Sequence, residues 1–239
     1  GFYIMNAGAP ETDGPPAAYL LGETLKTLGY RVSHVTDLNS AFLYRGLAER
    51  DEVIEFPIAD NETSCKFASD LIDKLNPSVI ISIERCSITP KGQYLNMWGV
   101  DISEHNAKLD YLFSQHDATV GIGDGGNEIG LGNLAEQIPS VDTLPNEPAA
   151  TSVTQLIIAS VSNWGGYGLI AALSLLTKRN LLPTAQREEE VIKYMVDQGA
   201  VDGMASKPVY AVDGFQLSEN SQTLEKLQAL LAQRGLRSL

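Results

Sequence analysis

Basic residues, cysteines and long apolar runs are all scarce in this chain of 239 residues. It has 17 Lys and Arg against 30 Asp and Glu, and its net charge of −13 argues against nucleic acid or an anionic membrane as a partner. No stretch approaches the roughly eighteen apolar residues of a membrane span, so the sequence indicates a soluble protein. Cys65 and Cys86 form no C-x-x-C pattern, so neither a disulfide framework nor a zinc site is indicated. A reducing compartment fits: the cytoplasm, or the mitochondrial matrix in a eukaryote.

Two common catalytic motifs are also missing. The sequence contains no G-x-x-x-x-G-K-[ST], which excludes a P-loop, and no G-x-S-x-G elbow for a Ser–His–Asp hydrolase. Of the three histidines, we expect His34 and His116 to be structural. His105 lies at the start of an expected helix and is the one histidine with a plausible role in proton transfer.

Short runs rich in Val and Ile alternate with runs whose apolar residues recur every three or four positions. Strands are expected at 2–5, 31–36, 53–56, 78–83, 118–122 and 155–161, and helices at 17–28, 63–75, 104–116, 167–177, 186–198 and 223–234. This alternation predicts an α/β fold with a mainly parallel sheet and helices on both faces, a Rossmann-like three-layer sandwich. We expect one domain over residues 1–239. Because the chain begins inside an expected strand, we also expect that some upstream residues are missing.

The most informative segment is the glycine turn at residues 121–130. Five glycines in ten residues surround Asp124 and Glu128 directly after the expected strand at 118–122. Glycine at this density indicates backbone with positive φ, or backbone that a ligand approaches closely. Ligands of parallel sheets bind beyond the carboxyl ends of the strands, so this turn predicts a binding site.

A dinucleotide site is an alternative interpretation of the same turn. Gly121, Gly123 and Gly126 fit G-x-G-x-x-G, but this pattern normally follows the first strand and here lies in mid-chain. The two carboxylates would face a pyrophosphate, and Gly130 and Gly132 weaken the helix that should hold it. A dinucleotide-dependent oxidoreductase is therefore the weaker hypothesis.

Polar residues also follow the other strands, and five carboxylates could meet at one site: Asp13, Glu84, Asp101, Asp124 and Glu128. Such a cluster suggests acid–base catalysis or a hard cation, Mg²⁺ or Mn²⁺. Structural roles are the alternatives. Asp13 and Asp101 could cap the helices that follow them, Glu84 could pair with Arg85, and Glu128 could bind the amides of its own turn.

Several of these segments together resemble the D-glutamate cyclase family, and more closely its catalytic C-terminal domain. The resemblance rests on residues 11–15, 84–85, 96–103, 121–130 and 162–167, and on the pair 201–203 and 212–214. It implies a hydro-lyase that converts D-glutamate to 5-oxo-D-proline with loss of water. Trp98 stands where the family often has a basic residue, which leaves open how the substrate's carboxylates are neutralised.

The resemblance implies a role for each motif residue. The catalytic carboxylates would be Asp124, Asp101, Glu128 and Glu84, of which Asp124 and Glu128 would hold a metal ion if one is needed. The substrate-binding residues would be Thr12, Asp13, Gly14, Arg85, Asn96, Gly123, Gly125, Gly126, Asn127, Ser162, Asn163, Trp164 and Gly165. The expected partner is a small amino acid, and the chain leaves room for a homo-oligomer. A domain that senses a small anionic metabolite without converting it is the rival hypothesis from another class.

Overall fold

Alternating apolar residues along three strands build the central parallel sheet in the computed structural model, which describes residues 1–49 and 52–236. The strands are β5 (Ile80–Ile83), β6 (Thr119–Gly123) and β7 (Gln155–Ile158), and β6 lies in the middle. Ile83 pairs with Ile122, which pairs in turn with Ile157. A second parallel pair consists of β3 (His34–Thr36) and β4 (Val53–Glu55).

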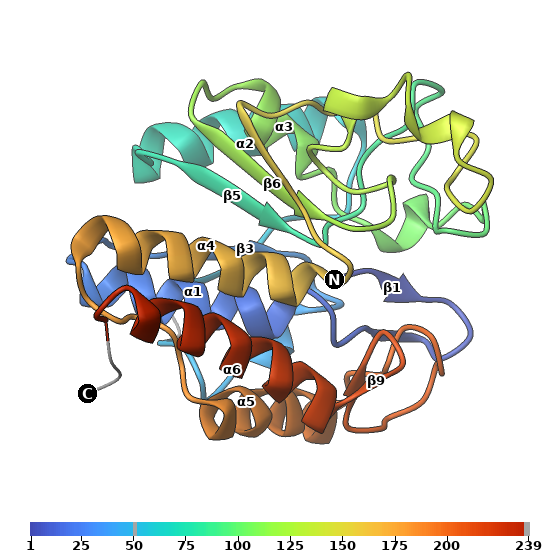
Figure 1. Ribbon diagram of the computed structural model, residues 1–239. Coiled ribbons are helices and arrows are strands. Elements are labelled where there is room, and N and C mark those ends of the chain that lie inside the picture. Colours follow the sequence, from blue (N-terminus) through green and yellow to red (C-terminus); the bar gives the residue numbers. More distant parts are fainter. Residues whose placement is uncertain (50–51, 237–239) are drawn as a thin grey trace.

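Helices cover both faces of this sheet (Figure 1). Ile83 and Ile122 belong to one apolar cluster with α1 (Pro15–Thr27) and α4 (Ser162–Thr177). On the other face a second cluster joins Ile80 to α2 (Asn61–Leu75) and α3 (Asp110–Ser114). Two further helices, α5 (Ala185–Gln198) and α6 (Leu217–Gln233), pack outside the first pair. The predicted α/β fold, with helices on both faces of a parallel sheet, is confirmed.

Local signals in the sequence explain where the predicted helices begin and end. In α2, the Asp60 side chain accepts a hydrogen bond from the amide of Thr63 at 2.8 Å. The helix ends at Asn76, whose φ of 45° is left-handed, directly before Pro77. The Thr184 hydroxyl caps α5 in the same way. No helix within the described residues is both long and apolar enough to cross a lipid bilayer.

Two expected elements are wrong in part. The run at 2–5 forms β1 (Tyr3–Ile4), which pairs antiparallel with β2 (Ala9–Pro10) in a hairpin separate from the parallel sheet. The helix expected at 104–116 is reduced to a short 3₁₀ turn, η3 (Ser103–His105), and to α3. The chain between them is extended because the amide of Ala107 donates to the Asp37 carboxylate, at 3.2 Å, instead of to a helical carbonyl.

Helix α4 begins at Ser162, five residues before the predicted start at 167. Gly165 and Gly166 therefore lie inside the helix. These glycines serve close packing. A Cβ on Gly165 would lie 2.6 Å from Cγ2 of Ile122 in the sheet. A Cβ on Gly166 would lie 2.8 Å from that of Ala17 in α1. Both contacts are shorter than atoms allow, so side chains at these positions would push α4 away from its neighbours.

Smaller elements complete the chain. Three more 3₁₀ turns are η1 (Ala41–Tyr44), η4 (Gly132–Leu134) and η5 (Ile138–Ser140). Strands β8 (Ala211–Val212) and β9 (Phe215–Gln216) form a hairpin before α6. The two residues between these strands, Asp213 and Gly214, have φ of 51° and 80°, as the tight Asp-Gly hairpin turn requires.

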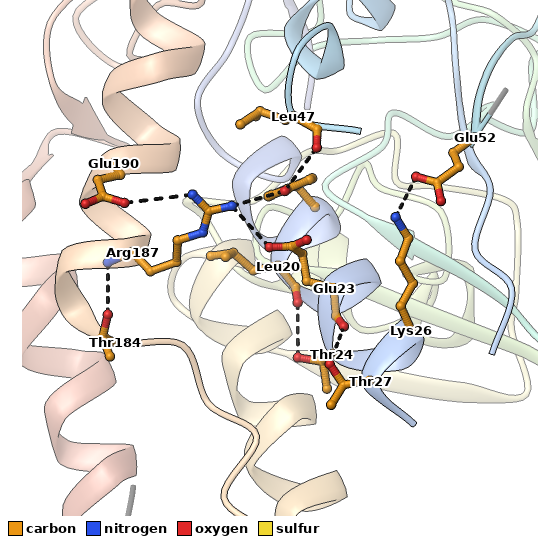
Figure 2. A network of polar contacts seen from close by, with 11 residues as sticks. Leu20, Glu23, Thr24, Lys26, Thr27, Leu47, Glu52, Thr184, Arg187 and Glu190 are labelled. Carbon is orange, nitrogen blue, oxygen red and sulfur yellow. Dashed lines mark hydrogen bonds and ion pairs between the residues drawn. The ribbon is translucent and has the colours of Figure 1, made fainter. Parts of the chain in front are cut away.

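A polar network on the surface connects α1 with α5 and with the segment before β4 (Figure 2). Arg187 donates to the Tyr19 hydroxyl and to Glu23, both at 3.1 Å. Lys26, on the same helix as Glu23, pairs with Glu52 at 2.5 Å. Each such exposed pair contributes at most about 1 kcal/mol to the free energy of unfolding, so the apolar clusters dominate the packing of these helices.

Candidate active site

Six carboxylates lie close together in the fold. We call this group the acidic centre: Glu11, Asp13, Glu84, Asp124, Glu128 and Asp213. One carboxylate oxygen from each member of two triads lies within 4.8 Å of the others; the triads are Asp13–Asp124–Asp213 and Glu84–Asp124–Glu128. Asp124, at the end of β6, is common to both triads. The glycine turn therefore contributes two of the six carboxylates, Asp124 and Glu128.

Two helices point their amino ends at this centre, and each is capped by a residue of the other's segment. The Asp13 carboxylate accepts from the amides of Ser162 and Asn163 at 2.8 and 2.7 Å, in the first turn of α4. The Asn163 side chain accepts in return from the amides of Gly14 and Ala17 at the start of α1, each at 3.1 Å. Both positive helix ends thus adjoin the carboxylates, which helps to hold negative charge there.

Glu84 is a buried member of the acidic centre at the end of the sheet. It follows β5 directly, with φ of 50°, a strained value for a residue other than glycine. Its carboxylate is buried and accepts a hydrogen bond from the Ser162 hydroxyl at 2.5 Å. Burial, followed by the charges of Glu128 and Asp124, raises the pKa of Glu84 well above its ordinary value. Both effects favour the protonated form of this carboxyl group.

The Glu128 carboxylate occupies the amides of the glycine turn. Its two oxygens accept from Gly125 and Gly126 at 2.6 and 2.7 Å. The expectation that these amides hold a substrate carboxylate therefore needs correction, because the chain supplies its own. Gly123 and Gly125 leave room for this arrangement: a Cβ at either position would lie 3.0 or 2.8 Å from an oxygen of Glu128.

Burial and mutual repulsion shift the remaining carboxylates in the same direction. The pKa of Asp124 is raised to about 10, first by burial and then by Asp13 and Glu128. Burial and the Asp13 charge raise the pKa of Asp213 to about 8. For Asp13 itself, burial and Glu11 raise the pKa to about 7. Glu11, buried and close to Asp213, has its pKa raised to about 8.

After burial, the largest influences on the pKa values of Glu84, Asp124 and Asp213 are other carboxylates, and no basic side chain is among them. Arg85 was expected to pair with Glu84 or to bind a substrate carboxylate, and the structure does not pair it with Glu84. Its guanidinium pairs with the buried Asp37 and donates to the carbonyl of Ala107. The acidic centre is thus suited to positive charge that comes from outside the chain.

Two predicted site residues lie apart from the acidic centre. The carboxylate of Asp101 is exposed and accepts from the amide of Ser103 at 2.9 Å and from Gln93 at 2.9 Å. Hydrogen bonds from Ser103 hold the pKa of Asp101 below its ordinary value. Asp101 belongs to neither triad, and its carboxylate instead holds the loop that leads into η3. Asn96 folds its own loop, since its side chain accepts from the amides of Trp98 and Val100.

The histidines also lie outside both triads. His105, the candidate for proton transfer, stacks on the ring of Tyr3 with centroids 4.3 Å apart. His34 is buried against Tyr44, and burial lowers its pKa to about 4. His116 lies between the carbonyls of Pro77 and Ala118.

The other residues expected to bind substrate have partners within the chain. The Thr12 hydroxyl donates to the carbonyl of Ala211 at 2.7 Å, and Trp164 donates to Asn220 at 2.8 Å. Gly14, with φ of 94°, lets α1 start against Glu84, since a Cβ there would lie 2.8 Å from that of Glu84. Asn127 donates to the carbonyl of Leu95 at 2.9 Å, while its own buried oxygen has no hydrogen-bond partner among the described residues.

Comparison with known proteins identifies the family of this chain. The profile of a family described as D-glutamate cyclase-like, C-terminal, matches residues 1–228. The chain belongs to this family. A human protein, D-glutamate cyclase, mitochondrial, is 25% identical over 262 aligned positions, which cover 91% of this chain and 42% of the human protein. The chain therefore spans less than half the length of that curated relative.

Two members of the acidic centre of this D-glutamate cyclase-like domain were not among the candidates. In the sequence, Asp213 stands only in the pair 201–203 and 212–214, and Glu11 only in residues 11–15, both as parts of the family resemblance. Asp213 comes from the β8–β9 hairpin, some ninety residues beyond Asp124, so no local pattern brings the two together. The one usable signal was the Val-Asp-Gly pair at 201–203 and 212–214. In its first copy, Asp202 accepts from the amide of Gly214 in the second, at 2.8 Å.

Proposed function

We propose that this domain cyclises D-glutamate to 5-oxo-D-proline with loss of water at the acidic centre. Family membership and the name of the human relative support the reaction class. The observation that carries the proposal is the second triad, in which a buried Glu84 lies within 4.8 Å of Asp124 and Glu128. The reaction needs one group that gives a proton and one that takes a proton, and this triad offers both.

The proton balance of the reaction sets the roles. The substrate's α-ammonium loses two protons, its nitrogen forms a bond to the γ-carboxyl carbon, and the γ C–O bond breaks. The departing oxygen leaves as water with both protons. Asp124, common to both triads, is our choice of base; it must be ionised to take a proton, and a cation bound beside it would favour that form against the burial that raises its pKa to about 10. Glu84, whose protonated form is favoured by burial, is our choice of proton donor to the departing oxygen.

A divalent cation, Mg²⁺ or Mn²⁺, fits the residues of the acidic centre. Every donor is a carboxylate oxygen, the ligand type that these hard cations prefer, and the charge has no basic counterpart among its strongest neighbours. Asp124 and Glu128, or Asp124 with Asp13 and Asp213, would hold the ion, which leaves Glu84 as the proton donor. Bound there, a cation would polarise the γ-carboxyl group and offset the charge of the site.

A sensor for a small anion is supported less well. Such a domain should bury basic side chains around its pocket. Here the converging side chains are acids, and Arg85 is already paired with Asp37. The dinucleotide hypothesis also loses support, because Glu128 fills the turn amides and the 3₁₀ turn η4 follows in place of a long helix. For the compartment we propose a reducing one, since Cys65 and Cys86 are both free thiols.

The test is to incubate the purified chain with D-glutamate or L-glutamate, with Mg²⁺, Mn²⁺ or EDTA, and to measure 5-oxoproline by chiral chromatography. The proposal predicts 5-oxo-D-proline from the D-enantiomer, more with the cation than with EDTA. Absence of product from both enantiomers, in protein shown to be folded by circular dichroism, would overturn it.

A further inference from the structure

The outer flank of α4 is a surface without charge on a strongly acidic protein. None of the sixteen residues of α4 is Asp, Glu, Lys or Arg, whereas the whole chain carries a net charge of −13. Residues recurring three and four positions apart remain uncovered along one side: Ala172 is exposed, and Leu176 is 80% exposed. A Cβ on Gly168 would meet no atom within 4 Å.

The neighbouring strand continues this surface. β7, which leads into α4, is an edge of the three-stranded sheet, and no strand among the described residues pairs with its outer side. Its last residue, Ile158, is 57% exposed. An open strand edge beside an apolar helix is a surface that proteins normally cover. We call the surface formed by Ile158, Gly168, Ala172, Leu175 and Leu176 the α4 flank.

Charge is distributed unequally between the two ends of α4. Its last turn is followed by Lys178 and Arg179. Its first turn lies beside the start of α6, because Trp164 donates to Asn220 at 2.8 Å, and the exposed Glu219 precedes that asparagine. One end of the α4 flank is thus basic and the other acidic.

We propose that the α4 flank is the contact between two copies of this chain, arranged antiparallel about a two-fold axis. In that arrangement Lys178 and Arg179 of each copy lie against the acidic end of the other. The uncharged middle places no like charges against each other within the contact. The small residues Gly168 and Ala172 at the middle let the two helices approach closely. A two-fold contact is the commonest arrangement of identical chains, and it is self-complementary in this way.

The test is sedimentation velocity from nanomolar to high micromolar protein, on the wild type and on Leu176→Asp. The wild type should dimerise, more weakly at high salt, because the ends attract by charge. Leu176→Asp should raise the dimer dissociation constant about thirtyfold or more, since it places a charge inside an apolar contact and close to the acidic end of the other copy. The matched control is Val141→Asp, because Val141 is 45% exposed outside the flank and its replacement should change nothing.

A cross-link locates the axis. In a Cys65→Ser background, Ala172→Cys should form a disulfide-linked dimer on mild oxidation, because a residue near a two-fold axis meets its own copy. Val141→Cys should remain unlinked. Three results would each overturn the proposal: a wild type that stays monomeric at high micromolar concentration, a dimer that Leu176→Asp leaves intact, or a dimer in which Ala172→Cys does not cross-link.

Discussion

Replacing Asp124 by asparagine should stabilise the metal-free protein while removing its function. The carboxyl of Asp124 has its pKa raised from an ordinary value of 3.8 to about 10 by burial and by its acidic neighbours. For an acid whose folded pKa is raised, the stabilising contribution is complete below the unfolded pKa and is lost as pH rises toward the folded pKa. The metal-free protein should therefore lose stability steadily between about pH 4 and pH 10.

The size of the effect follows from the same shift. One pKa unit corresponds to about 1.4 kcal/mol, and neutral pH lies about three units above the ordinary pKa of an aspartate. Retaining Asp124 therefore costs the folded state about 4 kcal/mol at pH 7, as an upper bound, because the neighbouring carboxylates share the repulsion. Asn has the same shape and no charge, so Asp124→Asn should raise Tm by up to about 10 °C in EDTA.

The assay is thermal unfolding by circular dichroism at pH 4 and at pH 7.5, in EDTA and in Mn²⁺. The gain of Asp124→Asn should appear at pH 7.5 and shrink at pH 4. Mn²⁺ should raise Tm of the wild type and not of the variant, because a ligand stabilises only the state that binds it. Asp70→Asn, at an exposed pair with Lys66, is the control and should change little. A lower Tm for Asp124→Asn in EDTA would refute this reasoning and make the carboxylate a structural group.

Three other predictions concern the scaffold. Burial raises the pKa of Glu188 to about 7, and neither of its carboxylate oxygens has a hydrogen-bond partner among the described residues. Glu188→Gln should therefore raise Tm at pH 8 and leave Tm unchanged near pH 4. An equal change in Tm at both pH values would contradict this prediction. Asp110 accepts hydrogen bonds from Tyr94 at 2.7 Å and from three other groups. Asp110→Ala should therefore lower the free energy of unfolding, measured in urea, by about 3 kcal/mol or more. A loss below about 1 kcal/mol would show that these hydrogen bonds do not stabilise the fold. In α4, Gly165→Ala should destabilise the protein by about 1–3 kcal/mol, because the added Cβ clashes with the sheet. Gly168→Ala in dilute solution should instead stabilise the protein by about 1 kcal/mol. The reverse order of stabilities would show that the helix packs differently.

Apolar periodicity was enough to predict the layers of the fold. The helices at 15–27 and 61–75 and the strands of the central sheet follow their patterns because each buries one face against the next layer. The pattern failed where a distant side chain takes over a backbone group. The amide of Ala107 donates to the Asp37 carboxylate, so it is not available for the helix that the sequence around Ala107 predicts.

The candidate site was predictable to the extent that single segments carry it. The glycine turn marked Asp124 and Glu128, and the end of β5 marked Glu84, all three of which the structure brings together. Which groups these carboxylates contact was not predictable from the sequence. Glu128 binds its own turn, and Asp213 reaches Asp124 from a hairpin far along the chain, because the two helix ends at Asp13 and Asn163 bring these segments together.

The central claim is that Asp124 takes part in the cyclisation of D-glutamate, and turnover by matched proteins tests it most directly. Wild type, Asp124→Asn and Asp101→Asn should be assayed together for 5-oxo-D-proline at saturating D-glutamate, with Mn²⁺ present. We expect full activity from the wild type, at least a hundredfold lower kcat from Asp124→Asn, as for the loss of a general base, and little change from Asp101→Asn. Unchanged turnover by Asp124→Asn, or a loss confined to Asp101→Asn, would contradict the assignment of the reaction to the acidic centre.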